Sequence, residues 1–167
     1  MTLEEFNKLP PEELRKHLYA CCGSTVWVEH MAMISPFNSV DHLMNMAERC
    51  WHKCDSGQWQ EAFRQHPRLG DIESLKEKFQ STADMAAQEQ AGANGASVEV
   101  LEELALGNKA YEKKFGFIYI LNATGKTAKV MLSILRIRLN NDIETEEIMA
   151  MVEQDKITKI RLEKLVS

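Results

Sequence analysis

Apolar residues recur every three or four positions along almost the whole chain, the spacing of the buried face of an amphipathic helix. Val40, Leu43 and Ala47 form one such stripe, which continues to Trp51. Sustained alternation of apolar and polar residues, the pattern of a half-buried strand, is absent from the sequence. The pattern therefore predicts an all-α protein, a compact multi-helix bundle formed by a single domain over residues 1–167.

Capping residues and helix breakers divide this pattern into separate helices. A capping box at Thr2 opens the first of them. A second helix is expected from Pro10-Pro11 to about Ala20, and a third is capped by Ser24 and broken by Pro36. A helix then starts at Ser39, and Gly57 separates it from the next, which ends at His66. The remaining expected elements are a helix with Ile72, Leu75 and Phe79, one through Met85 and Gln90, a loop over 92–95, a long helix from Val98 to about Phe115, an apolar run over 118–121 that could be extended, and helices over about 127–139 and 145–165.

Composition and charge narrow the classes of partner. The chain has 167 residues and a formal net charge of -5, with no long basic run, which argues against a nucleic-acid partner. No apolar run approaches the roughly 20 residues that span a bilayer. The acidic start, Met1 to Phe6, lacks the basic and apolar regions of a secretory signal. These features predict a cytoplasmic protein without a membrane segment.

Four cysteines, Cys21, Cys22, Cys50 and Cys54, raise the question of a metal site. Without an export signal, reduced thiols are expected rather than disulfides. Cys50 and Cys54 lie four residues apart with His52 between them, but no second ligand pair has zinc spacing. We therefore predict no metal site and interpret the cysteines as buried helix-packing residues.

The segment His66-Pro67-Arg68-Leu69-Gly70-Asp71 is the most informative motif. Pro67 disfavours helical torsions at His66, so the preceding helix should stop there with the imidazole at its exit. The unperturbed imidazole pKa of roughly 6.5 lies near neutral pH, which makes His66 a candidate acid or base. The alternative is a capped turn that happens to contain a histidine.

Three further segments carry polar groups. Gln88-Glu89-Gln90 precedes Gly92, and Glu89 could be a general acid or base, could hold a polar ligand, or could belong to a solvated helix end. The run at 118–121 and the residues after it could offer backbone groups to a flat heterocycle, or could be a buried connector. Arg161 lies among apolar residues of the last helix, where it could clamp a carboxylate, pair with an internal acid, or lie at the surface with a buried stem.

Taken together, these segments resemble the 2-oxo-4-hydroxy-4-carboxy-5-ureidoimidazoline (OHCU) decarboxylases of urate degradation. The resemblance covers nearly the whole chain. The segments that carry it are Cys22-Gly23-Ser24 with Trp27, Pro36-Phe37, the HPRLGD motif, EQAG at 89–92, the FGF segment at 115–117, Arg138-Leu139 and ITKIRL at 157–162.

This resemblance implies the family's all-helical fold, a homodimer, and cofactor-free loss of carbon dioxide from OHCU to give (S)-allantoin. His66 would be the acid or base, Glu89 would hold ureido or ring N–H groups, and Arg161 would bind a carboxylate or carbonyl oxygen. The other substrate-binding residues that the resemblance implies are Pro67, Ala86, Gln88 and Gln90, together with Tyr119, Ile120, Leu121, Asn122 and Ala123. The last five would bind through their backbone groups.

One position departs from the family pattern. Family members commonly carry serine three residues before the glutamate of the EQ pair, where this chain has Ala86. A hydroxyl contact to the substrate would then be missing, although a water could replace it. Two alternatives to the decarboxylase therefore stay open: a diverged paralogue that acts on a related ureido acid, and a non-catalytic helical interaction module.

Overall fold

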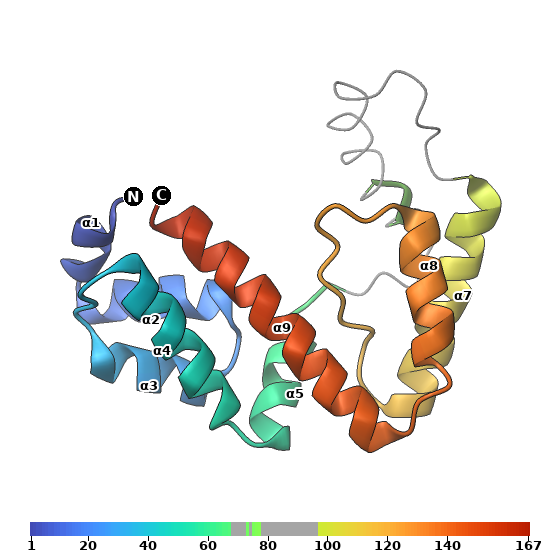
Figure 1. Cartoon of the computed structure of the whole chain (residues 1–167), viewed down its shortest axis with the longest axis horizontal. Coiled ribbons are helices and arrows are strands. Elements are labelled where there is room, and N and C mark those ends of the chain that lie inside the picture. The colour runs from blue at the N-terminus through green and yellow to red at the C-terminus, as the bar shows by residue number, and fades with distance from the viewer. Residues whose placement is uncertain (68–72, 74, 78–96) are drawn as a thin grey trace. The chain divides into compact units, whose positions relative to one another are not determined.

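The structure is a computed structural model that describes residues 1–67, 73, 75–77 and 97–167 (Figure 1). These residues form helices and loops with no strand, which confirms the all-α prediction. The chain forms two compact units, one of residues 1–66 with 147–167 and the other of residues 67–146. The single domain expected over 1–167 stays a prediction.

The first unit is built on a central helix. It contains α1 (Leu3–Asn7), α2 (Pro11–Cys21), α3 (Thr25–Ile34), α4 (Val40–His52), α5 (Ser56–Arg64) and, from Glu147 onward, α9 (Ile143–Leu165). Helix α3 packs against α2, α4 and α5. The amino group of Met1 donates to the carbonyl of Leu165 at 3.1 Å, so the two ends of the chain meet within this unit.

Two tryptophans fix the helices of this unit through both their rings and their indole N–H groups. Trp27 and Trp51 are almost completely buried. The indole of Trp27 donates to the carbonyl of Ala47 at 3.0 Å, which joins α3 to α4. The indole of Trp51 donates to the carbonyl of Met151 at 2.9 Å, which joins α4 to α9. A buried indole that satisfies its donor adds a directional contact to the burial of a large apolar surface.

The second unit is centred on the pair α7 (Val98–Phe115) and α8 (Ala128–Arg138), which pack against each other. Gly116 ends α7 with a left-handed φ of 79°, a conformation that glycine adopts without a steric penalty. The chain then runs without regular structure to Thr127. The rings of Tyr111 and Phe115 on α7 pack with the ring of Phe117 at the start of this run.

Several helix starts confirm the capping predictions. The Thr2 side chain accepts from the backbone N–H of Glu5 within a reciprocal capping box. Ser39 caps α4, and Pro11 occupies the first turn of α2. Thr127 caps α8 through the N–H of Val130.

Two expectations near helix starts were wrong. Gly57 does not separate two helices but lies in the first turn of α5, because Asp55 and Gln58 form a capping box that starts the helix just before it. Ser24 stands at the N-cap of α3 as expected, but its hydroxyl makes no capping hydrogen bond. The helix expected to end at His66 ends at Arg64.

Some predicted elements lie mostly outside the described residues. The helix with Ile72, Leu75 and Phe79 is described only at 73 and 75–77, where the residues are helical and Leu75 is buried. The helix through Met85 and Gln90 and the loop over 92–95 are not among the described residues. Within the described part of the chain, no helix is long and apolar enough to cross a membrane.

Gly107 lets α7 and α8 approach closely. A Cβ at this position would lie 2.6 Å from Cδ2 of Leu135, a side chain that is completely buried. We expect Gly107→Val to lower the free energy of unfolding by about 1–3 kcal/mol, the usual cost of overpacking a well-packed core. Ala110→Val at an exposed position of the same helix is the control and should cost about 0.5 kcal/mol. Urea unfolding of both variants checks this, and equal losses would contradict the close approach.

Candidate functional site

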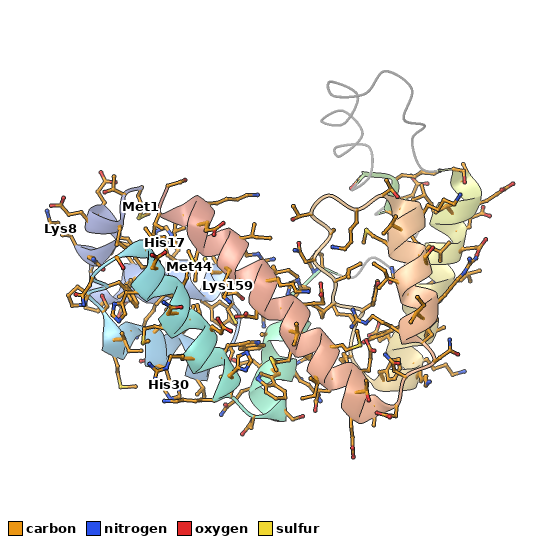
Figure 2. All side chains as sticks on the ribbon, viewed as in Figure 1. Met1, Lys8, His17, His30, Met44 and Lys159 are labelled. Atoms are coloured by element: carbon orange, nitrogen blue, oxygen red, sulfur yellow. The ribbon has the colours of Figure 1, made fainter. Side chains whose placement is uncertain are left out.

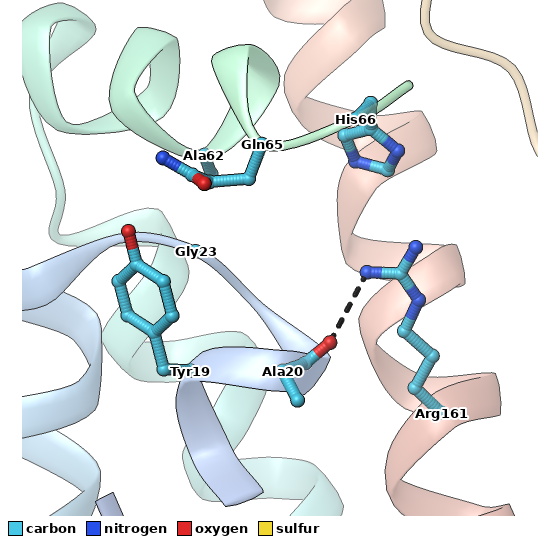
Figure 3. Close-up of a pocket in the computed structure, with 7 residues that line it drawn as sticks. All are labelled: Tyr19, Ala20, Gly23, Ala62, Gln65, His66 and Arg161. Carbon is cyan, nitrogen blue, oxygen red and sulfur yellow. Dashed lines mark hydrogen bonds between the residues drawn. The ribbon is translucent and has the colours of Figure 1, made fainter. Parts of the chain in front are cut away.

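The first unit contains a small pocket that brings together two of the residues singled out from the sequence. Its volume is about 260 Å³, just below the usual range for small-molecule sites of roughly 300–1,000 Å³. Figure 3 shows the lining residues, which come from α2, the link to α3, the end of α5, and α9: Tyr19, Ala20, Gly23, Ala62, Gln65, His66 and Arg161. His66 and Arg161 were both expected to serve a site, and both line this pocket.

The sequence around α5 explains how His66 reaches the pocket. The helix is fixed at its start by the Asp55 capping box and along its length by Phe63, which is fully buried. The N–H of His66 donates to the carbonyl of Phe63 at 3.2 Å, which closes the last turn. Pro67 follows, and the regular helix has already ended at Arg64, two residues before the end predicted from the motif. The imidazole is half-buried, as expected for a group that must meet a ligand.

The imidazole of His66 is held from α9 by Gln154. Its Nε2 lies 2.5 Å from Oε1 of Gln154, a residue that is completely buried. The amide nitrogen of Gln154 in turn donates to the hydroxyl of Thr158 at 3.0 Å. The ring is therefore oriented by a side chain whose own position is fixed, which is the arrangement required of a positioned acid or base.

Arg161 is anchored on α2. Its Nη1 donates to the carbonyls of Ala20 at 3.4 Å and Cys21 at 3.2 Å (Figure 3). These carbonyls end α2, where backbone acceptors lack partners within the helix and cations are favoured. One edge of the guanidinium is used for this anchor, and the group keeps further N–H donors with which it can bind an oxyanion in the pocket. The sequence left open whether Arg161 pairs with an internal acid, and in the structure it binds these two carbonyls.

A glycine allows the pocket wall to form. A Cβ on Gly23 would lie 2.2 Å from Cγ of Gln65 and 2.8 Å from its Cβ. The link between α2 and α3 therefore approaches the end of α5 more closely than any other residue would permit at position 23. The sequence indicated Gly23 only as a helix boundary, so this role is visible only in the folded chain.

The four cysteines supply no reactive nucleophile. All four are buried and reduced. Burial raises the pKa of Cys21 and Cys54 to about 11 and that of Cys22 to about 12, so these thiols stay protonated near neutral pH. The thiol of Cys54 donates to the carbonyl of Cys50 at 3.4 Å. Their interpretation as helix-packing residues is confirmed.

One group of side chains in the described residues has metal-ligand types close together. Glu48 and His52 on α4 and Asp155 on α9 place one ligand atom each within 4.8 Å of one another. Lys159, labelled in Figure 2, binds both carboxylates, at 2.8 Å from Glu48 and 3.0 Å from Asp155. Because an ammonium group already neutralises the two acids, we interpret the group as an ion-pair network that joins α4 to α9.

The predicted binding residues from Tyr119 to Ala123 belong to the second unit, where a buried ion pair holds them. Arg138 donates to the carbonyl of Ile120 at 2.6 Å and is paired with Glu146, and both charged side chains are buried. Burial, reinforced by the hydrogen bond to Glu146, raises the pKa of Tyr111, so its hydroxyl stays protonated and donates to that carboxylate at 2.5 Å. The carbonyl of Ile120 is thus occupied within the unit.

Four of the remaining predicted residues lie outside the described residues: Ala86, Gln88, Glu89 and Gln90. Pro67 is described and exposed. The roles of these residues and of Tyr119, Ile120, Leu121, Asn122 and Ala123 in binding stay predictions.

Sequence reasoning missed Tyr19, Gln65 and Gln154. Tyr19 and Gln65 are exposed residues of ordinary type, and no local signal distinguishes them. Gln154 had a usable signal, because Gln154, Thr158 and Arg161 follow one another at spacings of four and three, on one face of α9. Polar residues at this spacing predict a stripe of side chains that lie together on one face of a helix.

Comparisons with known proteins agree with these observations. The sequence model of the OHCU decarboxylase family matches residues 7–163. The chain is 33% identical over 147 residues to the uric acid degradation bifunctional protein TTL of Arabidopsis thaliana, covering 88% of this chain and 45% of that protein. It is 27% identical over 167 residues to the uric acid degradation bifunctional protein PucL of Bacillus subtilis (strain 168), covering 99% of this chain and 33% of that protein.

A solved structure also matches. A crystal structure of an OHCU decarboxylase in the presence of (S)-allantoin superposes with a TM-score of 0.74 and 34% identity, covering 89% of this chain and 95% of that chain. The match therefore covers nearly all of the chain in this structure, but less than half the length of the two bifunctional relatives.

Proposed function

Because this chain belongs to the OHCU decarboxylase family, we propose that it catalyses the decarboxylation of OHCU to (S)-allantoin, a step of urate degradation. The observation that carries this proposal is the pocket in which an oriented imidazole and an anchored guanidinium lie together. An acid or base beside an oxyanion-binding cation suits the loss of a carboxylate followed by proton delivery.

The reaction explains why no cofactor is expected. The bond between the ring carbon and the carboxylate breaks, carbon dioxide leaves, and the electron pair stays on the ring carbon. The adjacent ring carbonyl accepts that pair as an enolate, and one proton then returns to one face of the carbon. The protein must therefore orient the carboxylate, stabilise the enolate and deliver the proton, all of which side chains can do.

The two pocket residues suit two of these tasks. Arg161 would bind the departing carboxylate or a ring carbonyl oxygen, because its guanidinium is fixed on α2 and carries donors in a planar fork. His66 would transfer the proton, because its ring is fixed by Gln154 and lines the same pocket. Glu89 would hold the ureido or ring N–H groups. The resemblance also assigns substrate binding to the backbone from Tyr119 to Ala123.

The proposal is tested by making OHCU in the cuvette from urate with urate oxidase and 5-hydroxyisourate hydrolase, then adding this protein. Circular dichroism follows (S)-allantoin, because the uncatalysed reaction gives a racemate. We expect a fast signal of one sign. A rate equal to the background would overturn the proposal and direct the search to related ureido acids, as the alanine at position 86 would then suggest.

Arg161→Lys should raise KM for OHCU by about 10- to 100-fold. Lysine keeps the charge but loses the planar fork, and hydrogen bonds to charged groups contribute about 1.5–3 kcal/mol each, which corresponds to such a factor. Initial rates over a range of OHCU concentrations measure the change. Arg49→Lys at an exposed position of α4 is the control and should leave KM unchanged. An unchanged KM in Arg161→Lys would contradict the assigned binding role.

We propose a homodimer, which the resemblance implies, and a cytoplasmic location, which the composition and the acidic start of the sequence favour. The matched region covers 45% and 33% of the two bifunctional relatives. Whether a 5-hydroxyisourate hydrolase is a physical partner or only acts in the preceding step is a separate question, which co-purification of the two enzymes addresses.

A further inference from the structure

A chain of buried hydrogen bonds runs from the imidazole of His66 into the interior of the first unit. Gln154 is completely buried, and Thr158 is 2% exposed. The imidazole Nε2 lies 2.5 Å from Oε1 of Gln154, and the Gln154 amide nitrogen donates to the Thr158 hydroxyl at 3.0 Å. Neither Gln154 nor Thr158 was assigned a role from the sequence.

The direction of the hydrogen bond at His66 follows from how the Gln154 amide lies. Its nitrogen points to the Thr158 hydroxyl and its oxygen points to His66. A carbonyl oxygen only accepts. The Nε2 atom of His66 must therefore carry a hydrogen.

We propose that Gln154 is a positioning residue that holds the neutral His66 ring with its proton on Nε2. This inference rests on the proposed function for the identity of the substrate, but the tautomer itself does not depend on it. Thr158 acts one step further away, because its hydroxyl binds the nitrogen end of the Gln154 amide while the oxygen end faces the imidazole.

Charged and titratable groups near the pocket also act on the imidazole that Gln154 holds. Arg161 on α9 and Tyr19 on α2 line the same pocket as the imidazole. The guanidinium opposes a second positive charge nearby, whereas the carboxyl end of α5, where His66 lies, favours one. The oxygen of Gln154 adds a neutral acceptor that stabilises the N–H of Nε2 in both the neutral and the protonated ring.

Nitrogen-15 NMR of the full chain, with labelled histidine and without substrate, tests the tautomer directly. The chain has five histidines, and the signals of His66 are those missing from His66→Asn. Above the titration of the ring, Nε2 should be the protonated nitrogen and its proton should exchange slowly with water. In Gln154→Leu that exchange should accelerate at least tenfold. A proton on Nδ1 in the wild-type protein, or unchanged exchange in Gln154→Leu, would overturn the inference.

Kinetic variants separate positioning from general support of the fold. Gln154→Leu should lower kcat/KM about 10- to 100-fold, the usual loss when the partner that orients a functional histidine is removed. Gln154→Glu keeps an acceptor and adds a negative charge. The part of the pH profile of kcat/KM that reports the titration of His66 should therefore move to higher pH. Thr158→Val should resemble Gln154→Leu, and Thr158→Ser should restore the wild-type rate, which a packing role for the threonine methyl would not predict.

The outcomes distinguish this inference from the proposed function. A slowly exchanging Nε2 proton in a protein that does not convert OHCU would support the tautomer and overturn the assigned substrate. Conversion of OHCU with a pH profile that is identical in Gln154→Glu and wild type would support the function and overturn the role of Gln154.

Discussion

Replacing His66 with asparagine should lower kcat for OHCU decarboxylation by about 10²–10⁴-fold, the usual contribution of a positioned acid or base. Asparagine is polar and compact, but it cannot exchange a proton near neutral pH. Because the imidazole is half-buried at the end of α5 and contributes little to the core, the fold should be kept. Steady-state circular dichroism of allantoin formation measures the rate, and thermal unfolding checks the fold.

A matched control comes from the same helical unit. His52→Asn changes an exposed histidine at the end of α4 and should leave kcat unchanged. If His66→Asn retained full activity while folded, the proton would have to come from another group, and the pocket would only bind the substrate. If both variants lost activity equally, the loss would reflect general damage to the unit rather than the chemistry of His66.

The second large effect concerns stability. Arg138→Met should lower the free energy of unfolding by about 3–5 kcal/mol, because it strands the Glu146 carboxylate in the interior without its cation. The side chains of Arg138 and Glu146 are 1% and 0% exposed, so water cannot replace the lost partner. The carbonyl of Ile120 would lose its donor as well. Urea unfolding at constant pH measures the change.

A double variant separates the ion pair from its surroundings. Arg138→Met combined with Glu146→Leu removes both charges, and its loss should be clearly smaller than the sum of the two single losses. Arg136→Met is the control, because Arg136 pairs with Glu103 on the exposed surface, where such pairs contribute about 0–1 kcal/mol. A small loss in Arg138→Met would show that the second unit tolerates an isolated buried carboxylate.

The helices were predictable because their signals are local. A threonine or serine before an apolar stripe fixes a helix start within three residues, as Thr2 and Ser39 show. The error at Gly57 arose where two local signals competed. The Asp55 capping box supplies hydrogen bonds, whereas a glycine only permits a break, so the capping box decided where α5 starts.

The site was predictable only where one residue carried its own signal. His66 stood out because Pro67 follows it, and Arg161 because a cation among apolar residues needs a partner. Gln154 shares one face of α9 with Thr158 and Arg161, but it lies 88 positions from His66, so its contact with the imidazole depends on how α5 and α9 pack. The role of Gly23 likewise depends on the nearby Gln65, because a Cβ at position 23 would clash with that side chain. Contacts between distant segments therefore form the part of the site that sequence reasoning could not reach.

The buried cysteines bear on how inhibition of this protein should be interpreted. All four thiols belong to the first unit, and the second unit has none. Since each is shielded and protonated, an alkylating reagent can reach it only after the helices of that unit separate. Loss of function under such a reagent would thus record how often the first unit opens, and would not identify a cysteine that acts on the substrate.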